Sequence, residues 1–171
     1  MRTRIWSLTM GSVLHTPRLE LALLEPETAR ALAAGINRNG HVWAPGYPLG
    51  STLLCAELTA AAAAQHAPLG EFGIYQVIRR ADGTVIGDVG FTGPPDATGA
   101  VQLGCAITHD ARGQGYATEA LSALLDWARR QSGLTCVLAD TTRSNLASQR
   151  LLERVGMHRI GQDGELLYYM L

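Results

Sequence analysis

The chain has 171 residues, a formal net charge of -1, 47% hydrophobic residues and 17% charged residues. This length allows one domain with its own core, and the composition excludes a disordered segment. The near-neutral charge gives no reason to expect nucleic acid or an acidic membrane as a partner.

Three cysteines, Cys55, Cys105 and Cys136, cannot form a fully paired framework, and no metal-ligand spacing joins them to the histidines. Buried free thiols are the simpler interpretation of Cys105 and Cys136. No run is long enough to span a bilayer, and the first residues lack a clear cleavage site. We therefore expect a reduced, cytoplasmic protein without a metal.

The first part of the chain predicts one strand, followed by two helices that a loop separates. Alternating leucines indicate a strand, Pro26 favours a first helical turn, and an alanine- and leucine-rich run indicates a second helix. In chain order we expect a tail at 1–13, a single domain over 14–171, and within it a strand at Leu14–Leu24, a helix at Pro26–Ala34, a loop at 35–50 and a helix at Ser51–Gln65.

An antiparallel meander is expected in the middle of the chain. The dipeptide Asp82-Gly83 is a strong signal for a tight hairpin turn between two strand-like runs. A looser turn leads to a third strand. The three predicted strands are Phe72–Arg79, Thr84–Phe91 and Ala100–Thr108.

A strand, a helix and a strand follow in the second half, which normally means a parallel pair joined by a crossover. Apolar residues recur at helical spacing from Ala117 to Ala128, and a β-rich run covers 135–140. A last helix starts near Ser144 or Asn145, both good N-caps, and ends at Gly156. The apolar hairpin after it, ending in Leu166–Leu171, suggests homodimer contact.

The most informative stretch runs from Arg112 to Ala117, with sequence RGQGYA, between the third meander strand and the amphipathic helix. Glycines at such a junction let backbone N–H groups approach a ligand, and the helix N-terminus adds partial positive charge. The Walker A lysine is absent, and the meander before the motif excludes a Rossmann half. The stretch therefore predicts a cradle for a pyrophosphate other than that of a nucleoside triphosphate.

These residues carry a resemblance to a known family. The run RGQGYA resembles motif A of the GCN5-related N-acetyltransferase (GNAT) family, and Asn145 through Met157 resembles the asparagine helix that follows it there. Thr16–Leu21 and Ala117–Ala120 are similar to the branch that includes the ribosomal-protein N-terminal acetyltransferases.

The resemblance implies an α/β (α+β) fold, with a mixed, largely antiparallel sheet of about seven strands, helices on both faces and a splayed pair of strands, the third meander strand and that at 135–140. It implies acetyl-coenzyme A as co-substrate, with its pantetheine arm in the gap and its pyrophosphate on the N–H groups of Arg112 through Ala117. Asn145 could contact the same arm or be only an N-cap. The cofactor-binding residues so implied are Ala106, Ile107, Thr108, Arg112, Gly113, Gln114, Gly115, Tyr116, Ala117, Thr118 and Asn145.

The chemistry expected at this site is direct attack of an amine on the thioester, since no activated cysteine or serine dyad is visible. A backbone N–H of Ile107 or Thr108 is the nearest candidate to stabilise the oxyanion. Many relatives place a tyrosine acid where this chain has Leu152. Ser148, on the same inward helix face, is our substitute proton donor, although a serine there could instead bond a helix carbonyl.

The base is the most open assignment. Asp88 lies in a strand with apolar alternate neighbours and could face the acceptor, while Glu71, His109 and an ordered water are alternatives. Trp43 and Tyr47 could line the acceptor pocket or close a core. We expect an N-acetyltransferase acting on a primary amine of a protein N-terminus or a small molecule. A non-catalytic acyl-coenzyme A sensor and a scaffold module are the alternatives.

Overall fold

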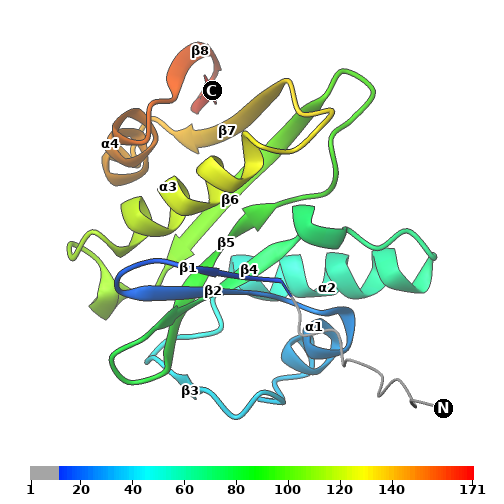
Figure 1. Ribbon diagram of the computed structural model, residues 1–171. Helices are drawn as coiled ribbons and strands as arrows, with labels where there is room; N and C mark the ends of the chain where they lie inside the picture. The colour runs from blue at the N-terminus through cyan, green and yellow to red at the C-terminus, as the bar shows by residue number, and fades with distance from the viewer. Residues whose placement is uncertain (1–11) are drawn as a thin grey trace, which may run out of the picture.

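The computed structural model describes residues 12–171. These residues form one sheet of nine strands, most of them antiparallel, in the order β1-β2-β4-β5-β6-β7-β9-β8, with β3 beside β5 (Figure 1). The strands are β1 (Val13–His15), β2 (Leu19–Leu23), β3 (Val42–Trp43), β4 (Ile74–Arg79), β5 (Thr84–Phe91), β6 (Ala100–Ile107), β7 (Cys136–Thr142), β8 (His158–Asp163) and β9 (Leu166–Met170). The helices are α1 (Pro26–Ala33), α2 (Gly50–Ala64), α3 (Tyr116–Ala128) and α4 (Leu146–Arg154), with short 3₁₀ turns at Gly70–Phe72 and His109–Ala111.

The mixed, largely antiparallel sheet is confirmed, but it has nine strands where about seven were expected. The single first strand that the leucines predicted is a hairpin, β1 and β2. The Thr16 N–H donates to the Leu19 carbonyl at 2.9 Å, and Pro17 in the turn has no N–H to continue a strand. The predicted tail, residues 1–13, lies almost wholly outside the described residues, and Val13 already belongs to β1.

Helices cover both faces of the sheet. Adjacent residues of β5 show this, because neighbouring side chains of a strand point to opposite faces. Val89 packs into the main core together with Leu121 and Leu124 of α3. Asp88 instead accepts a hydrogen bond from Thr52 of α2. The helices α3 and α2 therefore lie on opposite faces, as the ribbon also shows (Figure 1).

The sheet splays between β6 and β7. The two strands are parallel neighbours only from Ala100–Gln102 against Cys136–Leu138. Beyond that point β6 continues to Ile107 beside β5, and β7 continues to Thr142 beside β9. The expected splayed pair and the crossover through α3 are thus both present. The gap exposes one backbone edge of β6 that has no neighbouring strand.

Close approach of β5 and β6 beside this gap gives a first prediction. A Cβ on Gly87 would lie 2.2 Å from the Ala106 carbonyl oxygen, which is backbone and cannot rotate away. We expect Gly87→Ala to lower the free energy of unfolding by about 3 kcal/mol, the cost of forcing atoms into a packed site. Urea unfolding measures this, with Gly104→Ala as control, because a Cβ there meets nothing within 4 Å. Equal midpoints for the two variants would contradict the prediction.

Candidate active site

A row of free backbone donors lies where β6 turns into α3. Gly113 and Gly115 both have a left-handed backbone, with φ of 73° and 80°. Within residues 12–171 the N–H groups from Gly113 through Thr118 have no hydrogen-bond partner, and no side chain caps α3. Together with the positive end of the helix dipole, these donors form a site for an anionic group.

Arg112 is not part of this row, contrary to the expectation that the row starts there. Its N–H donates to the His109 carbonyl at 3.1 Å, inside the 3₁₀ turn. Its side-chain Nε donates to the Ile107 carbonyl at 2.9 Å. Arg112 therefore ties the corner to the end of β6, and its backbone donor is already used.

A cavity of about 60 Å³ occupies the gap between the splayed strands. This volume holds several water molecules and is open to solvent. The cavity is lined by residues of β6, β7 and α4 and by one residue of α3. Its lining residues are Leu103, Gly104, Cys105, Leu121, Ala139, Asp140, Ser148, Leu151 and Leu152.

Ser148 is held at this cavity by the first turn of α4. The Asn145 side-chain oxygen caps the helix by accepting the Ser148 N–H at 3.1 Å. The Ser148 hydroxyl bonds no other residue in the described part of the chain, so the alternative bond to a helix carbonyl is not formed. Leu152, in the position where many relatives have tyrosine, lines the same cavity and has no proton to give.

The backbone edge that faces the gap can be assigned by strand alternation. The Thr108 N–H donates to the Ile86 carbonyl at 2.9 Å, and the Thr92 N–H to the Gln102 carbonyl at 3.1 Å. Because hydrogen-bonded pairs alternate along an antiparallel ladder, Ala106 also bonds toward β5. The Thr108 N–H, one of the two candidate oxyanion donors, is therefore already bonded within the sheet, and the Ala106 N–H is directed toward β5.

Alternation leaves Ile107 and Cys105 with their N–H groups directed into the gap. Of these two, only Cys105 lines the cavity. Sequence reasoning overlooked the Cys105 N–H, although counting back by two from Ile107 would have found it. Burial and the nearby Asp88 carboxylate raise the pKa of the Cys105 thiol. The side chain is therefore a protonated thiol and a poor nucleophile.

Asp88 is a buried carboxyl group on the α2 face of β5. Its side chain is 4% exposed and accepts a hydrogen bond from the Thr52 hydroxyl. Burial raises its pKa to about 6, which the Thr52 bond only partly offsets. It does not line the cavity, but it lies opposite Ala106, which adjoins the lining residue Cys105.

The other acidic and basic candidates are placed differently. Glu71 lies in the 3₁₀ turn before β4, and the His109 side chain is 90% exposed beside Asp110. Neither lines the cavity. Asp140 does, and its carboxylate accepts a hydrogen bond from Gln102 Nε2 at 2.6 Å. No sequence signal singled out Asp140, because its place depends on how far β6 and β7 pair.

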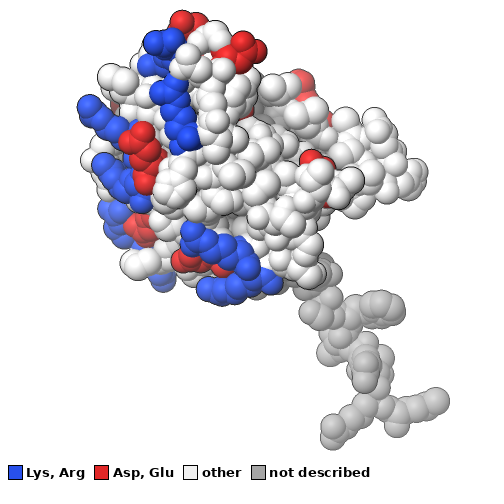
Figure 2. Space-filling view, turned by 90° about the horizontal axis from the view of Figure 1, so that it is seen from above, with Lys and Arg blue, Asp and Glu red and all other residues white. Residues whose placement is uncertain are grey.

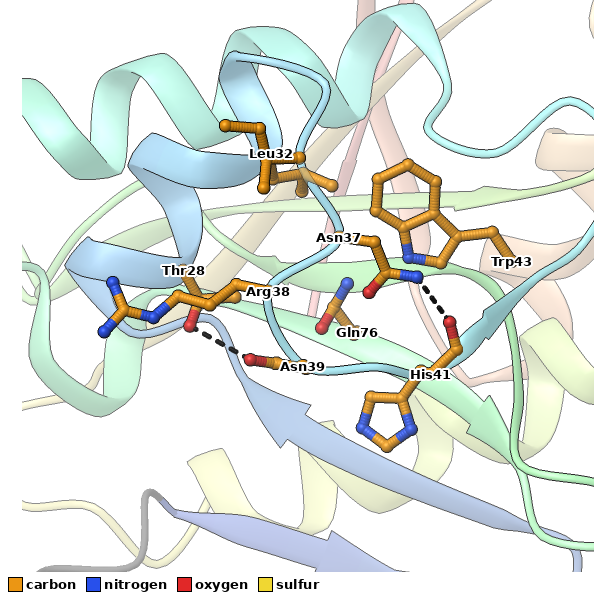
Figure 3. Close-up of a pocket in the computed structure, with 9 residues that line it drawn as sticks. Thr28, Leu32, Asn37, Arg38, Asn39, His41, Trp43 and Gln76 are labelled. Atoms are coloured by element: carbon orange, nitrogen blue, oxygen red, sulfur yellow. Dashed lines mark hydrogen bonds between the residues drawn. The ribbon is translucent and has the colours of Figure 1, made fainter.

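A smaller cavity of about 10 Å³ lies between α1 and the loop that follows it (Figure 3). Asn37 spans the loop by donating to the His41 carbonyl, and Trp43 closes one side. The volume holds about one water molecule. Tyr47 stacks edge-on against Trp43 at 5.8 Å and accepts a hydrogen bond from Gln76. Both aromatic residues belong to the small core under α1 and α2, so closing that core accounts for them.

Charged side chains are unevenly spread over the surface. Seen from above, arginines and acidic residues gather on the side where α4 and the start of α3 lie in Figure 1, and much of the remaining face is uncharged (Figure 2). Both signs mix within the charged region. Among residues 12–171, no helix is both long and apolar enough to cross a bilayer. The same residues contain no group of three or more His, Cys, Asp or Glu side chains suited to a metal ion.

The sheet with its splayed centre, the free N–H row and the cavity together define a fold and site of the acetyltransferase type. The sequence profile described as "Acetyltransferase (GNAT) domain" matches residues 18–158, and the chain belongs to this family.

Individual relatives are more distant. The chain is 31% identical over 85 residues to the uncharacterized N-acetyltransferase YjdG of Bacillus subtilis (strain 168), an alignment covering 50% of the chain and 51% of that relative. The chain thus spans about half the length of the curated relative it matches.

Solved structures share the fold over nearly the whole chain. One is the ribosomal-protein-S5-alanine acetyltransferase from Vibrio fischeri, with a TM-score of 0.67, 14% identity, and coverage of 94% of this chain and 96% of that one. Another is RimL, a ribosomal L7/L12 α-N-protein acetyltransferase in complex with coenzyme A, with a TM-score of 0.68, 15% identity, and coverage of 94% and 97%.

Proposed function

We propose that the protein transfers an acetyl group from acetyl-coenzyme A to a primary amine. The observation that carries this proposal is the continuity of two features within one β6–α3 unit. A row of unpartnered N–H groups, suited to a diphosphate, leads into a gap whose free strand edge can pair with an amide-bearing arm. Family membership and the coenzyme A bound to the structural neighbour RimL support the same ligand.

The residues divide the work by position. Gly113 through Thr118, whose N–H groups are free, would hold the diphosphate. The Cys105 N–H is directed into the cavity, where a thioester carbonyl would lie, and it replaces Ile107 as our candidate oxyanion donor. Ile107 stays a candidate partner for the arm, since its N–H faces the same gap. Asn145 serves as helix cap, and contact with the arm remains part of the proposal.

Proton transfer is assigned to two side chains. Ser148 would pass a proton to the departing thiolate and recover one from solvent water in the open cavity, since it lines the cavity and its hydroxyl bonds no described residue. Asp88 would receive the proton of the amine, through water, because its pKa of about 6 suits a base near neutral pH. Attack would be direct, because the Cys105 thiol is held protonated.

The acceptor is proposed from the neighbours alone. Both solved structures described above are named as ribosomal-protein acetyltransferases, so a protein N-terminus is the acceptor to test first, with small-molecule amines second. We also propose a cytoplasmic protein that forms homodimers through the last hairpin. Leu166 and Met170 of β9 support the dimer, as they are 38% and 40% exposed.

The proposal is tested by thiol release from acetyl-coenzyme A with a panel of peptides and small amines, beside calorimetry with coenzyme A. We expect coenzyme A binding and acceptor-dependent release of one thiol per acetylated amine. The second candidate, an acyl-coenzyme A sensor, is favoured by Leu152, which removes the usual acid from the cavity. Binding without release against every amine would support the sensor, and absence of binding would overturn both.

A further inference from the structure

Arg18, in the turn before β2, reaches across to the corner that carries the free N–H row. Its Nη1 donates to the Gln114 carbonyl at 2.9 Å. Its guanidinium carbon lies 4.6 Å from the centre of the Tyr116 ring. Its Nη2 lies 3.4 Å from where a Cβ on Gly115 would be. One side chain, far away in sequence, therefore contacts Gln114 and Tyr116 and lies close to Gly115 between them.

Glu119 holds Arg18 in this position. Its carboxylate accepts from the Arg18 Nε at 2.6 Å, from the Arg18 backbone N–H at 2.9 Å, and from the Thr16 hydroxyl at 2.6 Å. The Glu119 side chain is 17% exposed. Three charge-assisted bonds on a half-buried carboxylate fix geometry better than a single exposed ion pair. The hairpin and the start of α3 are thus locked together.

The bond to Gln114 has a consequence for the next N–H group. In a trans peptide the C=O and the following N–H point in opposite directions in one plane. Because the Gln114 carbonyl is turned toward Arg18, the Gly115 N–H is turned away from it. That N–H is one of the unpartnered donors of the row. Glycine at 115, with φ of 80°, is free to rotate if this restraint is lost.

We propose that Arg18 is a positioning residue that orients the Gly115 N–H toward the diphosphate of the acyl carrier. This inference rests on the proposed function, because it presumes that coenzyme A binds at the corner. Arg18 acts through the Gln114–Gly115 peptide and contributes to ligand affinity by keeping a donor preorganised. An ordinary hairpin-to-helix ion pair would instead affect stability alone.

The test compares two ligands that differ in the diphosphate end. Calorimetry gives the Kd of coenzyme A and of pantetheine, which lacks the diphosphate, for the wild type and Arg18→Ala. We expect the Kd of coenzyme A to rise about ten-fold, the loss of roughly one hydrogen bond to a charged group, and that of pantetheine to change less than about two-fold. KM for acetyl-coenzyme A should rise by the same factor, with kcat retained.

Controls separate positioning from stability. Arg129→Ala removes an exposed ion pair between Arg129, at the end of α3, and Asp126, and it should leave both Kd values unchanged. Arg18→Lys keeps the charge but cannot bond Gln114 and Glu119 together as a guanidinium does, so it should also raise the Kd of coenzyme A. This variant serves as the test if Arg18→Ala fails to fold. Equal loss for both ligands, or no loss for either, would overturn the inference. A wild type that binds no coenzyme A would instead overturn the proposed function.

Discussion

Ser148→Ala is expected to lower kcat for acetyl transfer about 100-fold, at the low end of what general acid–base catalysis contributes. Affinity for coenzyme A should stay within about two-fold, because the donors proposed for the diphosphate, Gly113 through Thr118, lie at the start of α3 and not on α4. The reason is chemical. The departing thiolate needs a proton, and of the two α4 residues Ser148 and Leu152 that line the cavity only Ser148 has a hydroxyl group. Steady-state kinetics together with calorimetry measure the two quantities.

The matched control is Ser122→Ala, which removes an exposed hydroxyl from the outer face of α3. It should leave kcat unchanged. The helix itself tolerates alanine at 148, since Asn145 caps α4 through the Ser148 backbone N–H, which alanine retains. A Ser148→Ala enzyme with wild-type kcat would show that solvent supplies the proton. Loss of coenzyme A binding without loss of kcat would also contradict the proton-donor role.

The local signals in the sequence account for what could be predicted of the fold. Asp82-Gly83 marks the β4–β5 hairpin, and the change from strand to helical periodicity marks the crossover that makes β6 and β7 parallel. By contrast, β3 is two residues long and pairs with β5, about 40 residues away, so no periodicity could reveal it. The turn that divides β1 from β2 contains Pro17. The alternating leucines on both sides of it predicted one continuous strand instead.

The site divides in the same way. The glycines of the corner and the Asn145 cap depend on interactions between residues close in sequence, so they can be predicted from the sequence alone. Arg18 and Glu119 are separated by 101 positions, and Asp140 meets Gln102 only because the pairing of β6 and β7 stops there. Which N–H groups face the gap follows from ladder alternation, which needs the register. For this reason the sequence alone could not separate Ile107 from Thr108 as candidate oxyanion donors, and it did not indicate the Cys105 N–H.

Asp88→Asn is expected to stabilise the protein at pH 8 and to inactivate it. The pKa of Asp88 is about 6 in the folded protein against 3.8 ordinarily, because the carboxyl group is buried. Below about pH 4 the carboxyl is protonated in both states and costs nothing. Between about pH 4 and 6 the folded state binds more protons than the unfolded state, so the free energy of unfolding falls as pH rises. Above pH 6 the full cost, about 3 kcal/mol, is present.

Asparagine removes this cost while its side-chain oxygen can still accept from Thr52. Urea unfolding of Asp88→Asn should therefore show a free energy of unfolding higher than the wild type by roughly 2–3 kcal/mol at pH 8, with the difference vanishing toward pH 4. The control Asp126→Asn replaces an exposed carboxylate on α3, and its free energy of unfolding at pH 8 should stay close to that of the wild type. If the difference in free energy of unfolding between Asp88→Asn and the wild type were the same at pH 4 and pH 8, the buried charge would not cost stability and the prediction would be wrong.

The same variant tests the base. In the wild type kcat/KM should rise with pH through about 6 as Asp88 ionises, and Asp88→Asn should lose this rise and about 100-fold in rate. A variant that is more stable but less active is expected where a residue lowers the free energy of unfolding and is needed for activity. Stability gained with activity intact would remove Asp88 from the mechanism. It would leave Asp140, the carboxylate that lines the cavity, as the group to replace next.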